Sequence, residues 1–205
     1  MSILTQIAQI QTTDGRTQAP GRGQPPGTMK AGSRSKRFTV SDLNKMDQES
    51  FTRAVGPVFE HSPWVAERTW AKRAFASFGA LHGALCETLA GAVERKKLEL
   101  IRAHPDLVGR AALASSLTAA STHEQASAGL NRLTRDEVAL FRQYNRAYRK
   151  KFGFPFVICA RLNKKAAILK GFDTRLKHSR AQEIRAALEE VGKIARLRLE
   201  DIIQT

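Results

Sequence analysis

The sequence has few of the features that mark secreted, membrane-spanning or disulfide-stabilised proteins. Its 205 residues include only two cysteines, Cys86 and Cys159, too few for a disulfide framework and badly spaced for a zinc site. The longest apolar stretch, residues 74–93, is interrupted by His82, Glu87 and three glycines, so it does not resemble a membrane span. The N-terminus lacks the basic segment, apolar run and cleavage site of a secretion signal. We therefore expect a cytoplasmic protein.

Acidic residues are scarce relative to basic ones. The chain has 19 Asp and Glu against 34 Lys and Arg, a formal net charge of +15. This excess favours an anionic partner, either a polymer or a metabolite. The charge makes a basic helical nucleic-acid-binding protein the alternative to a small-molecule enzyme. The absence of a helix-turn-helix, zinc or RNA-binding signature counts against that alternative.

The composition divides the chain into a tail and one domain. Residues 1–37 hold three of the seven prolines, five of the fourteen glycines and six basic residues, with Asp14 as their only acidic residue. We interpret them as a flexible basic tail, with a weak resemblance to an organelle transit peptide as the alternative to a plain disordered extension. Residues 38–205 have the length and the apolar content for a single core.

Helix signals dominate this domain. The predicted starts are serine or threonine caps, namely Ser41, Ser62 before Pro63, Ser121, Thr134 and Ser179. The last three have Glu or Gln three residues later, as in a capping box. Residues 134–151 and 180–203 repeat apolar side chains at helical spacing. Only residues 152–160 look extended, and one strand cannot form a sheet. We predict an all-α fold, a single-domain helical bundle with one short extended apolar segment.

A histidine stands at a predicted helix end in Ala103-His-Pro-Asp-Leu107. Pro105 disfavours helical backbone at the residue before it, so the helix predicted over residues 94–103 ends at His104. The residues alone favour a role in capping the last carbonyls of that helix. Imidazole also suits proton transfer near neutral pH, which is the functional interpretation.

Two other segments have both a structural and a functional interpretation. Ser121 and Glu124 form a sufficient capping box, yet a helix N-terminus also attracts the oxygens of an anionic or carbonyl-rich ligand. The run from Phe156 to Ala160 fits a buried core segment, and it equally fits the wall of a pocket for a planar heterocycle. The residues themselves leave both questions open.

Five segments together resemble one family. They are Glu60-His-Ser-Pro-Trp64, Ala103-His-Pro-Asp-Leu107, Ser121-Thr-His-Glu-Gln-Ala-Ser-Ala-Gly-Leu130, Phe152-Gly-Phe-Pro-Phe-Val-Ile-Cys159 and Ile194-Ala-Arg-Leu-Arg-Leu199. In order and spacing, from about residue 38 to 203, they closely resemble the 2-oxo-4-hydroxy-4-carboxy-5-ureidoimidazoline (OHCU) decarboxylase family, whose members complete the conversion of urate to allantoin. Any one of the segments is a weak signal, whereas five in register are a strong one.

The resemblance implies a site and a mechanism. His104 would be the catalytic proton-transfer residue, working beside Glu124, while Arg198 is the best match for the site arginine, ahead of Arg196 and Arg175. The implied substrate-binding residues are Pro105, Ser121, Gln125, Phe156, Val157, Ile158, Cys159 and Ala160, with His123 as a solvent-facing bystander. The resemblance further implies a small-molecule ureidoimidazoline substrate and a homodimer. We expect no cofactor and no metal, because the C=N bond of the substrate can accept the electron pair. No membrane or specific nucleic acid is expected as a partner.

Overall fold

The structure, a computed structural model, describes residues 37–109 and 117–204. Within these ranges every regular element is a helix, and the one extended pairing is an isolated bridge between Phe38 and Ile203. The all-α prediction is therefore confirmed. No helix in the described ranges is long and apolar enough to cross a membrane. The predicted tail lies outside the described residues except for Arg37, so its flexibility stays a prediction.

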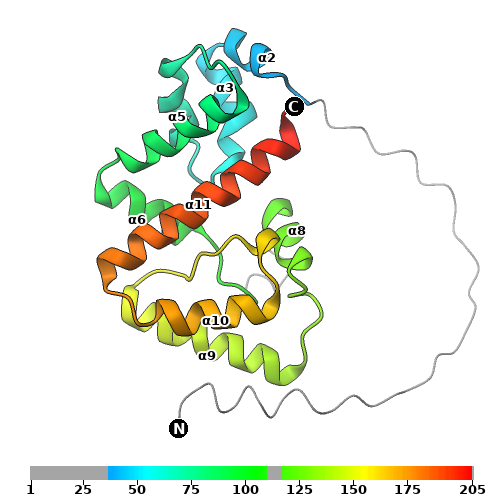
Figure 1. The fold of residues 1–205 in the computed structure, drawn as a ribbon, viewed down its shortest axis with the longest axis vertical. Helices are drawn as coiled ribbons and strands as arrows, with labels where there is room; N and C mark the ends of the chain where they lie inside the picture. The colour runs from blue at the N-terminus through cyan, green and yellow to red at the C-terminus, as the bar shows by residue number, and fades with distance from the viewer. Residues whose placement is uncertain (1–36, 110–116, 205) are drawn as a thin grey trace, which may run out of the picture. The chain divides into compact units, whose positions relative to one another are not determined.

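The first half of the domain consists of short helices. In chain order they are α2 (Val40–Lys45), α3 (Gln48–Val55), the 3₁₀ turn η2 (Gly56–Val58), α4 (Trp64–Thr69), the 3₁₀ turn η3 (Trp70–Lys72), α5 (Phe78–Ala90) and α6 (Glu94–Ala103). Helix α4 packs against both α3 and α5, and Phe51 of α3, Val65 of α4 and Leu85 of α5 are fully buried. This group lies at the top of Figure 1.

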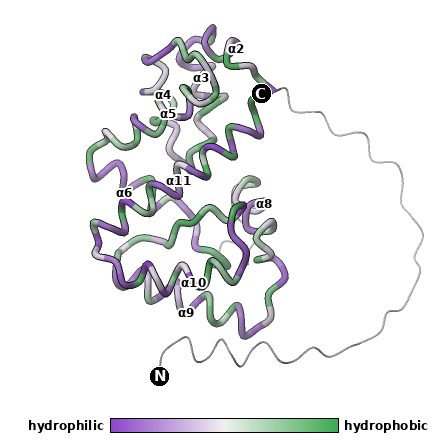
Figure 2. The backbone as a smooth tube through the Cα atoms, viewed as in Figure 1, coloured by the Kyte–Doolittle hydropathy of each residue, from purple (hydrophilic) through white to green (hydrophobic). Residues whose placement is uncertain are grey.

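The second half contains the two longest of the described helices, α9 and α11, together with shorter ones. In chain order its elements are α8 (Ala119–Ser127), α9 (Arg135–Phe152), the 3₁₀ turn η4 (Ala160–Leu162), α10 (Lys165–Arg175) and α11 (Arg180–Ile202). Helix α11 runs between the upper group and the lower group of α8, α9 and α10 (Figure 1) and contacts α5, α6 and η2. Hydrophobic and hydrophilic residues alternate along α9 and α11 (Figure 2), as expected for amphipathic helices with one buried face. The helices predicted over residues 94–103, 134–151 and 180–203 are confirmed to within a residue or two.

The predicted extended segment, residues 152–160, is shorter in the structure: Phe152 ends α9, Ala160 begins η4, and residues 153–159 between them belong to no helix or strand. An aromatic cluster anchors it: the Phe156 ring stacks on Phe172 of α10 with the centroids 3.9 Å apart and meets Tyr148 of α9 edge-on. Arg175 adds a hydrogen bond of 2.7 Å from Nη1 to the Val157 carbonyl, and its own charge is paired with buried Glu183. The segment is thus fixed by α9, α10 and α11 together.

The helix caps are partly as predicted. Thr134 and Ser179 cap α9 and α11 through reciprocal capping boxes, so both predictions are confirmed. The predicted caps at Ser41 and Ser62 are wrong: Thr39 caps α2, where its side chain and that of Asp42 complete the box, and α4 begins after Pro63 without a side-chain cap.

The predicted cap at Ser121 is also wrong, and this error bears on the site. The N-cap of α8 is Thr118, whose hydroxyl accepts from the Ser121 N–H, so Ser121 lies inside the first turn. Glu124 is then one turn into the helix, too far along to reach back to the N-cap backbone. Both side chains are consequently available for other partners.

Candidate active site

His104 is held at the end of α6 in a defined orientation. The backbone leaves the helix there (φ −71°, ψ 138°), as the following proline demands. The ring Nδ1 lies 2.9 Å from the Leu100 carbonyl oxygen. Because a carbonyl can only accept, Nδ1 carries the proton and Nε2 keeps its lone pair. The structure thus confirms the helix end and leaves Nε2 suited to act as a base.

The surroundings of His104 favour its neutral form. Its side chain is almost wholly buried, with 7% of the residue exposed. Burial lowers the pKa of His104, and it outweighs the opposing influence of the Leu100 hydrogen bond and of the negative charges on Glu60 and Glu124. A neutral imidazole at neutral pH is ready to accept a proton.

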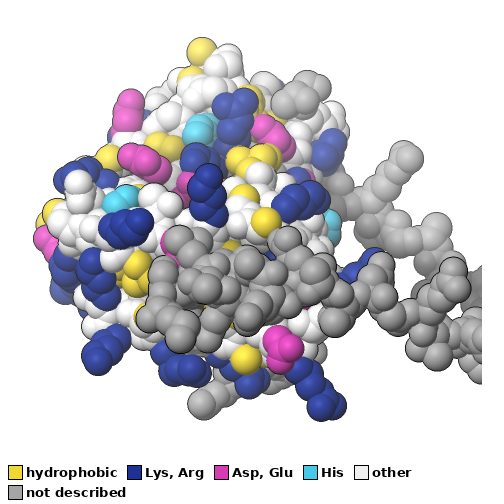
Figure 3. Space-filling model, turned by 60° about the horizontal axis from the view of Figure 1, so that its bottom comes forward, with side chains coloured by type: hydrophobic (Ala, Val, Ile, Leu, Met, Phe, Trp, Pro, Cys, Tyr) yellow, Lys and Arg dark blue, Asp and Glu magenta, His cyan; other side chains and the backbone are white. Residues whose placement is uncertain are grey.

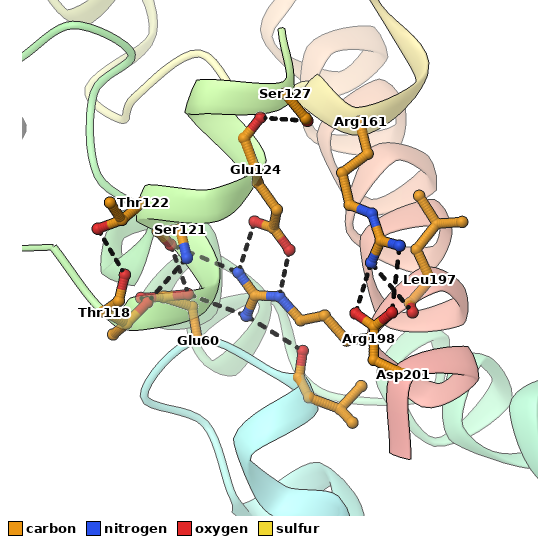
Figure 4. Close-up of polar contacts among 11 residues, drawn as sticks. Glu60, Thr118, Ser121, Thr122, Glu124, Ser127, Arg161, Leu197, Arg198 and Asp201 are labelled. Atoms are coloured by element: carbon orange, nitrogen blue, oxygen red, sulfur yellow. Dashed lines mark hydrogen bonds and ion pairs between the residues drawn. The ribbon is translucent and has the colours of Figure 1, made fainter. Parts of the chain in front are cut away.

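Arg198 of α11 and Glu124 of α8 form a buried two-pronged ion pair. Arg198 Nε donates to Glu124 Oε1 at 2.7 Å and Nη2 donates to Oε2 at 2.8 Å (Figure 4). Only 6% of Arg198 is exposed. The two runner-up arginines lie elsewhere, since Arg196 is exposed beside Glu200 and Arg175 is paired with Glu183. The structure therefore brings Arg198, and neither of the others, to Glu124.

Glu60, which sequence reasoning did not assign, completes this cluster. It lies in the loop between η2 and α4 with 4% of the residue exposed. Its Oε2 accepts from Arg198 Nη1 at 3.0 Å and from the Ser121 hydroxyl at 3.1 Å, while Oε1 accepts from the Thr118 hydroxyl at 3.1 Å (Figure 4). Burial is the largest single influence and would raise the pKa of Glu60. The charge and hydrogen bond of Arg198, together with His104 and the Thr118 hydroxyl, outweigh it, so the pKa lies below its ordinary value. The one sequence feature that pointed to Glu60 was its position at the start of the segment Glu60-His-Ser-Pro-Trp64, which resembles the family.

The predicted residues converge on one small pocket. It encloses about 30 Å³ and is lined by His104, Pro105, Leu107, Ser121, Glu124, Gln125, Phe156, Val157, Ile158, Ala160, Ile194 and Arg198. Leu107 and Ile194 are apolar additions that the sequence did not single out. Gln125 also braces the pocket, because its Oε1 accepts from the Val108 N–H at 3.1 Å. His123 is exposed, as predicted.

Cys159 is the one predicted site residue outside this lining. Its N–H donates to Glu190 Oε2 at 2.7 Å, and its carbonyl accepts from the Asn163 amide at 3.0 Å. Burial raises the pKa of its thiol, which disfavours the reactive thiolate. Cys159 thus helps to fix the end of the pocket wall.

His104 and Glu124 share the pocket, but each has its own hydrogen-bond partner. Imidazole Nδ1 is bound to Leu100, and both carboxylate oxygens of Glu124 face Arg198. The predicted cooperation between His104 and Glu124 is therefore electrostatic in this structure. In the described part of the chain, no group of three or more His, Cys, Asp or Glu side chains is arranged to hold a metal ion.

Comparison with known proteins gives a consistent result. Residues 44–200 match the family model described as OHCU decarboxylase. The chain is 46% identical over 166 residues to the 2-oxo-4-hydroxy-4-carboxy-5-ureidoimidazoline decarboxylase of Halalkalicoccus jeotgali, covering 81% of this chain and 92% of that protein. It is 38% identical over 166 residues to the uric acid degradation bifunctional protein of Bacillus subtilis, covering 81% of this chain and 33% of that larger protein.

The solved structures agree. A crystal structure of (S)-allantoin synthase superposes with a TM-score of 0.65 at 31% identity, covering 82% of this chain and 54% of that one. A crystal structure of OHCU decarboxylase in the presence of (S)-allantoin, at 21% identity and a TM-score of 0.56, covers 75% of this chain and 96% of that one and supports the fold. The matched residues include every side chain of the pocket described above. The chain therefore belongs to the OHCU decarboxylase family.

Proposed function

We propose that this protein decarboxylates OHCU to (S)-allantoin in uric acid degradation, with the pocket around His104 as its active site. Family membership and the two decarboxylase-related proteins above support the reaction. The observation that supports the site is the convergence of His104, Glu124 and Arg198, from three separate helix regions, on one buried pocket.

The substrate brings its own electron acceptor. Its carboxylate and hydroxyl share one ring carbon, which is next to a C=N bond. When the bond to the carboxylate breaks, CO2 leaves and the electron pair passes into the C=N system. The nitrogen of the former C=N bond takes up one proton. The hydroxyl proton then moves to the carbon of that former C=N bond as the hydroxyl carbon becomes a carbonyl, so each turnover consumes one proton. The protein has to orient the carboxylate out of the ring plane, stabilise the developing charge and deliver the proton to one face.

The orientation of His104 fits the proton-transfer role. With Nδ1 fixed on Leu100, Nε2 is the ring atom that accepts a proton from the substrate hydroxyl and returns it. The imidazolium formed in between is stabilised by the charges of Glu60 and Glu124, both of which favour protonated His104. Arg198 orients the anionic edge of the substrate.

The extended segment supplies the wall for the heterocycle. Phe156, Val157 and Ile158 line the pocket, the first two buried and Ile158 partly exposed. Val157 is tethered through its carbonyl to Arg175, and Cys159 through its N–H to Glu190, so the segment is fixed at two points. A rigid wall with an apolar face matches a planar ring that has to be held in one orientation.

Binding requires the pocket to widen. A volume of about 30 Å³ corresponds to roughly one water molecule, far less than a ureido-substituted ring needs. The ion pair between Glu124 and Arg198 joins two residues of the pocket lining, and its rearrangement is the simplest way to make room.

The nucleic-acid alternative is not favoured by the surface. Figure 3 shows Lys and Arg side chains scattered in separate groups, with acidic and apolar side chains between them. Several of the basic residues are already paired with carboxylates, among them Arg149 with Asp106, Arg161 with Asp201 and Arg180 with Glu94. A continuous basic stripe, which would follow a phosphate backbone, is not seen on this face.

The proposal is tested by following urate oxidation products with and without the protein. Ultraviolet absorbance reports loss of the ureidoimidazoline, and circular dichroism reports optical activity. We expect rapid formation of optically active (S)-allantoin with the protein present, and slow formation of racemic product without it. Equal rates in both samples would overturn the proposal.

We make two further proposals. The family resemblance supports a homodimer as the active protein, and the low cysteine content supports action on a free small molecule in the cytoplasm. Sedimentation velocity at micromolar concentration tests the first, with a monomer as the contrary result. Cell fractionation tests the second, and enrichment in a membrane or organelle fraction would contradict it.

A further inference from the structure

We propose that Glu60 is a positioning residue of this active site. Glu60 stays hydrogen-bonded to one edge of the Arg198 guanidinium. At the opposite edge, the carboxylate of the incoming substrate replaces that of Glu124. The inference rests on the proposed function, and it assigns to Glu60 a role separate from those of His104 and Glu124.

The first observation is that Arg198 has no spare donor. A guanidinium has five N–H groups. Nε and one Nη2 proton go to Glu124, the other Nη2 proton faces the Ser121 hydroxyl at 3.4 Å, and the two Nη1 protons face Glu60 at 3.0 Å and the Val58 carbonyl at 3.4 Å. A substrate carboxylate can bind Arg198 only by replacing one of these partners.

The second observation is that the two carboxylates lie on different sides of Arg198. Glu124 lines the small pocket with His104 and the extended wall. Glu60 instead lines a separate cavity of about 650 Å³, together with Phe59, Thr118 and Arg198 itself. Arg198 therefore belongs to both cavities, and the carboxylate that faces the reaction site is Glu124. The substrate carboxylate therefore has to replace Glu124 at the edge of Arg198 formed by Nε and Nη2.

The third observation is that Glu60 is anchored independently of Arg198. The Thr118 and Ser121 hydroxyls both donate to it, and Thr118 is also the N-cap of α8. Glu60 thus joins the start of α8 to the C-terminal part of α11, where Arg198 lies (Figure 4). When Glu124 releases Arg198, the guanidinium keeps a buried counter-ion and its position, which avoids leaving a buried cation unpaired.

The charges agree with this assignment. With His104 neutral, Glu60, Glu124 and Arg198 carry a net charge of −1, and an anionic substrate would make it −2. This excess of negative charge favours the imidazolium that forms when His104 accepts the proton of the substrate hydroxyl. Glu60 stays ionised throughout, since Arg198 and two hydroxyls favour its charged form.

The decisive variant is Glu60→Gln, which keeps the size of the side chain and one acceptor oxygen but removes the charge. Glu124 then becomes the only carboxylate on Arg198 and is harder to displace. We expect KM to rise about tenfold or more, as for the loss of one charge-assisted hydrogen bond, with a smaller fall in kcat. The matched control is Glu67→Gln, the same change at an exposed position of α4, which should behave as the parent.

A pH profile separates positioning from a merely structural role. The charged groups facing His104 are Glu60 from the loop before α4, Glu124 from α8 and Arg198 from α11. Removing the Glu60 charge lowers the pKa of His104, so the acidic limb of kcat/KM should move to lower pH in Glu60→Gln. Glu60→Asp keeps the charge on a shorter side chain, so its acidic limb should match the parent and its KM should fall between the two.

The outcomes are distinct. If the parent protein forms no (S)-allantoin, the proposed function fails. If the parent is active and folded Glu60→Gln shows the parent KM and the parent pH profile, the positioning role fails, even if the melting temperature drops. If Glu60→Gln and Glu60→Asp both lose their helical circular dichroism signal, Glu60 is a folding residue and the inference is overturned.

Discussion

The buried ion pair between Glu124 and Arg198 allows one substitution to be worked through in detail. In Glu124→Gln the new amide keeps a carbonyl oxygen that can accept from one N–H of Arg198. Its NH2 group, however, replaces the second carboxylate oxygen and faces an N–H of Arg198. In the parent, the carboxylate oxygens of Glu124 lie 2.7 and 2.8 Å from the Arg198 nitrogens. The variant thus loses one charge-assisted hydrogen bond and gains a donor–donor contact.

The magnitude follows from these contacts. Losing a charge-assisted hydrogen bond costs about 1.5–3 kcal/mol, and removing one partner of a buried ion pair costs about 3–5 kcal/mol. Arg198 keeps Glu60 as a counter-ion, so we expect an intermediate loss of about 2–4 kcal/mol. For a domain of this size that corresponds to a melting temperature about 5–15 °C lower. A capping box at this position would predict a loss of at most about 1 kcal/mol.

Thermal melts by circular dichroism, paired with the (S)-allantoin assay, test this expectation. We expect Glu124→Gln to retain its helix content at 20 °C and to lose at least about 100-fold in turnover, because the carboxylate charge beside His104 is gone. Glu124→Ala should be at least as inactive and still less stable. His123→Gln, an exposed neighbour on α8, is the control and should match the parent. A Glu124→Gln protein that melts within about 2 °C of the parent would refute the argument that this pair stabilises the fold.

Three other predictions address the proton-transfer group and the cofactor. In His104→Asn the amide can still donate to the Leu100 carbonyl, so this variant should keep the fold and lose about 100- to 10,000-fold in turnover. Near-normal turnover with an unchanged circular dichroism spectrum would mean that His104 is only a helix-end residue. His123→Asn is the control. Because the pKa of His104 is lowered on folding, the unfolded chain binds this proton more readily, and stability should fall as pH drops below about 6.5. Melts at pH 7.5 and 5.5 should show a smaller decrease for His104→Asn than for the parent, and equal decreases would contradict the buried neutral imidazole. Turnover should survive prolonged treatment with a strong chelator, and a loss restored by one divalent ion would contradict the cofactor-free mechanism.

The caps show where local sequence is sufficient and where it is not. Thr134 with Glu137 and Ser179 with Gln182 satisfy each other within four residues, so the pattern predicts the bonds correctly. Ser121 and Glu124 have the same spacing, but their partners come from distant parts of the chain. Ser121 bonds to Glu60, 61 positions earlier, and Glu124 to Arg198, 74 positions later. A buried charge selects the partner that neutralises it, and this competition lies beyond the reach of a local pattern.

By itself the sequence determined the helical class, the boundaries of the long amphipathic helices, the end of α6 at His104 and the family. The helices depend on residues close together in the chain, through the periodicity of apolar side chains and a proline that ends a helix. The family depends on several short segments that occur in a fixed order. Only the tertiary structure decided which arginine meets Glu124, that Cys159 supports the pocket wall from outside its lining, and that Glu60 belongs to the site at all. These outcomes depend on hydrogen bonds between side chains from α8, from α11 and from the loop before α4. Packing of the whole core brings these elements within hydrogen-bonding distance.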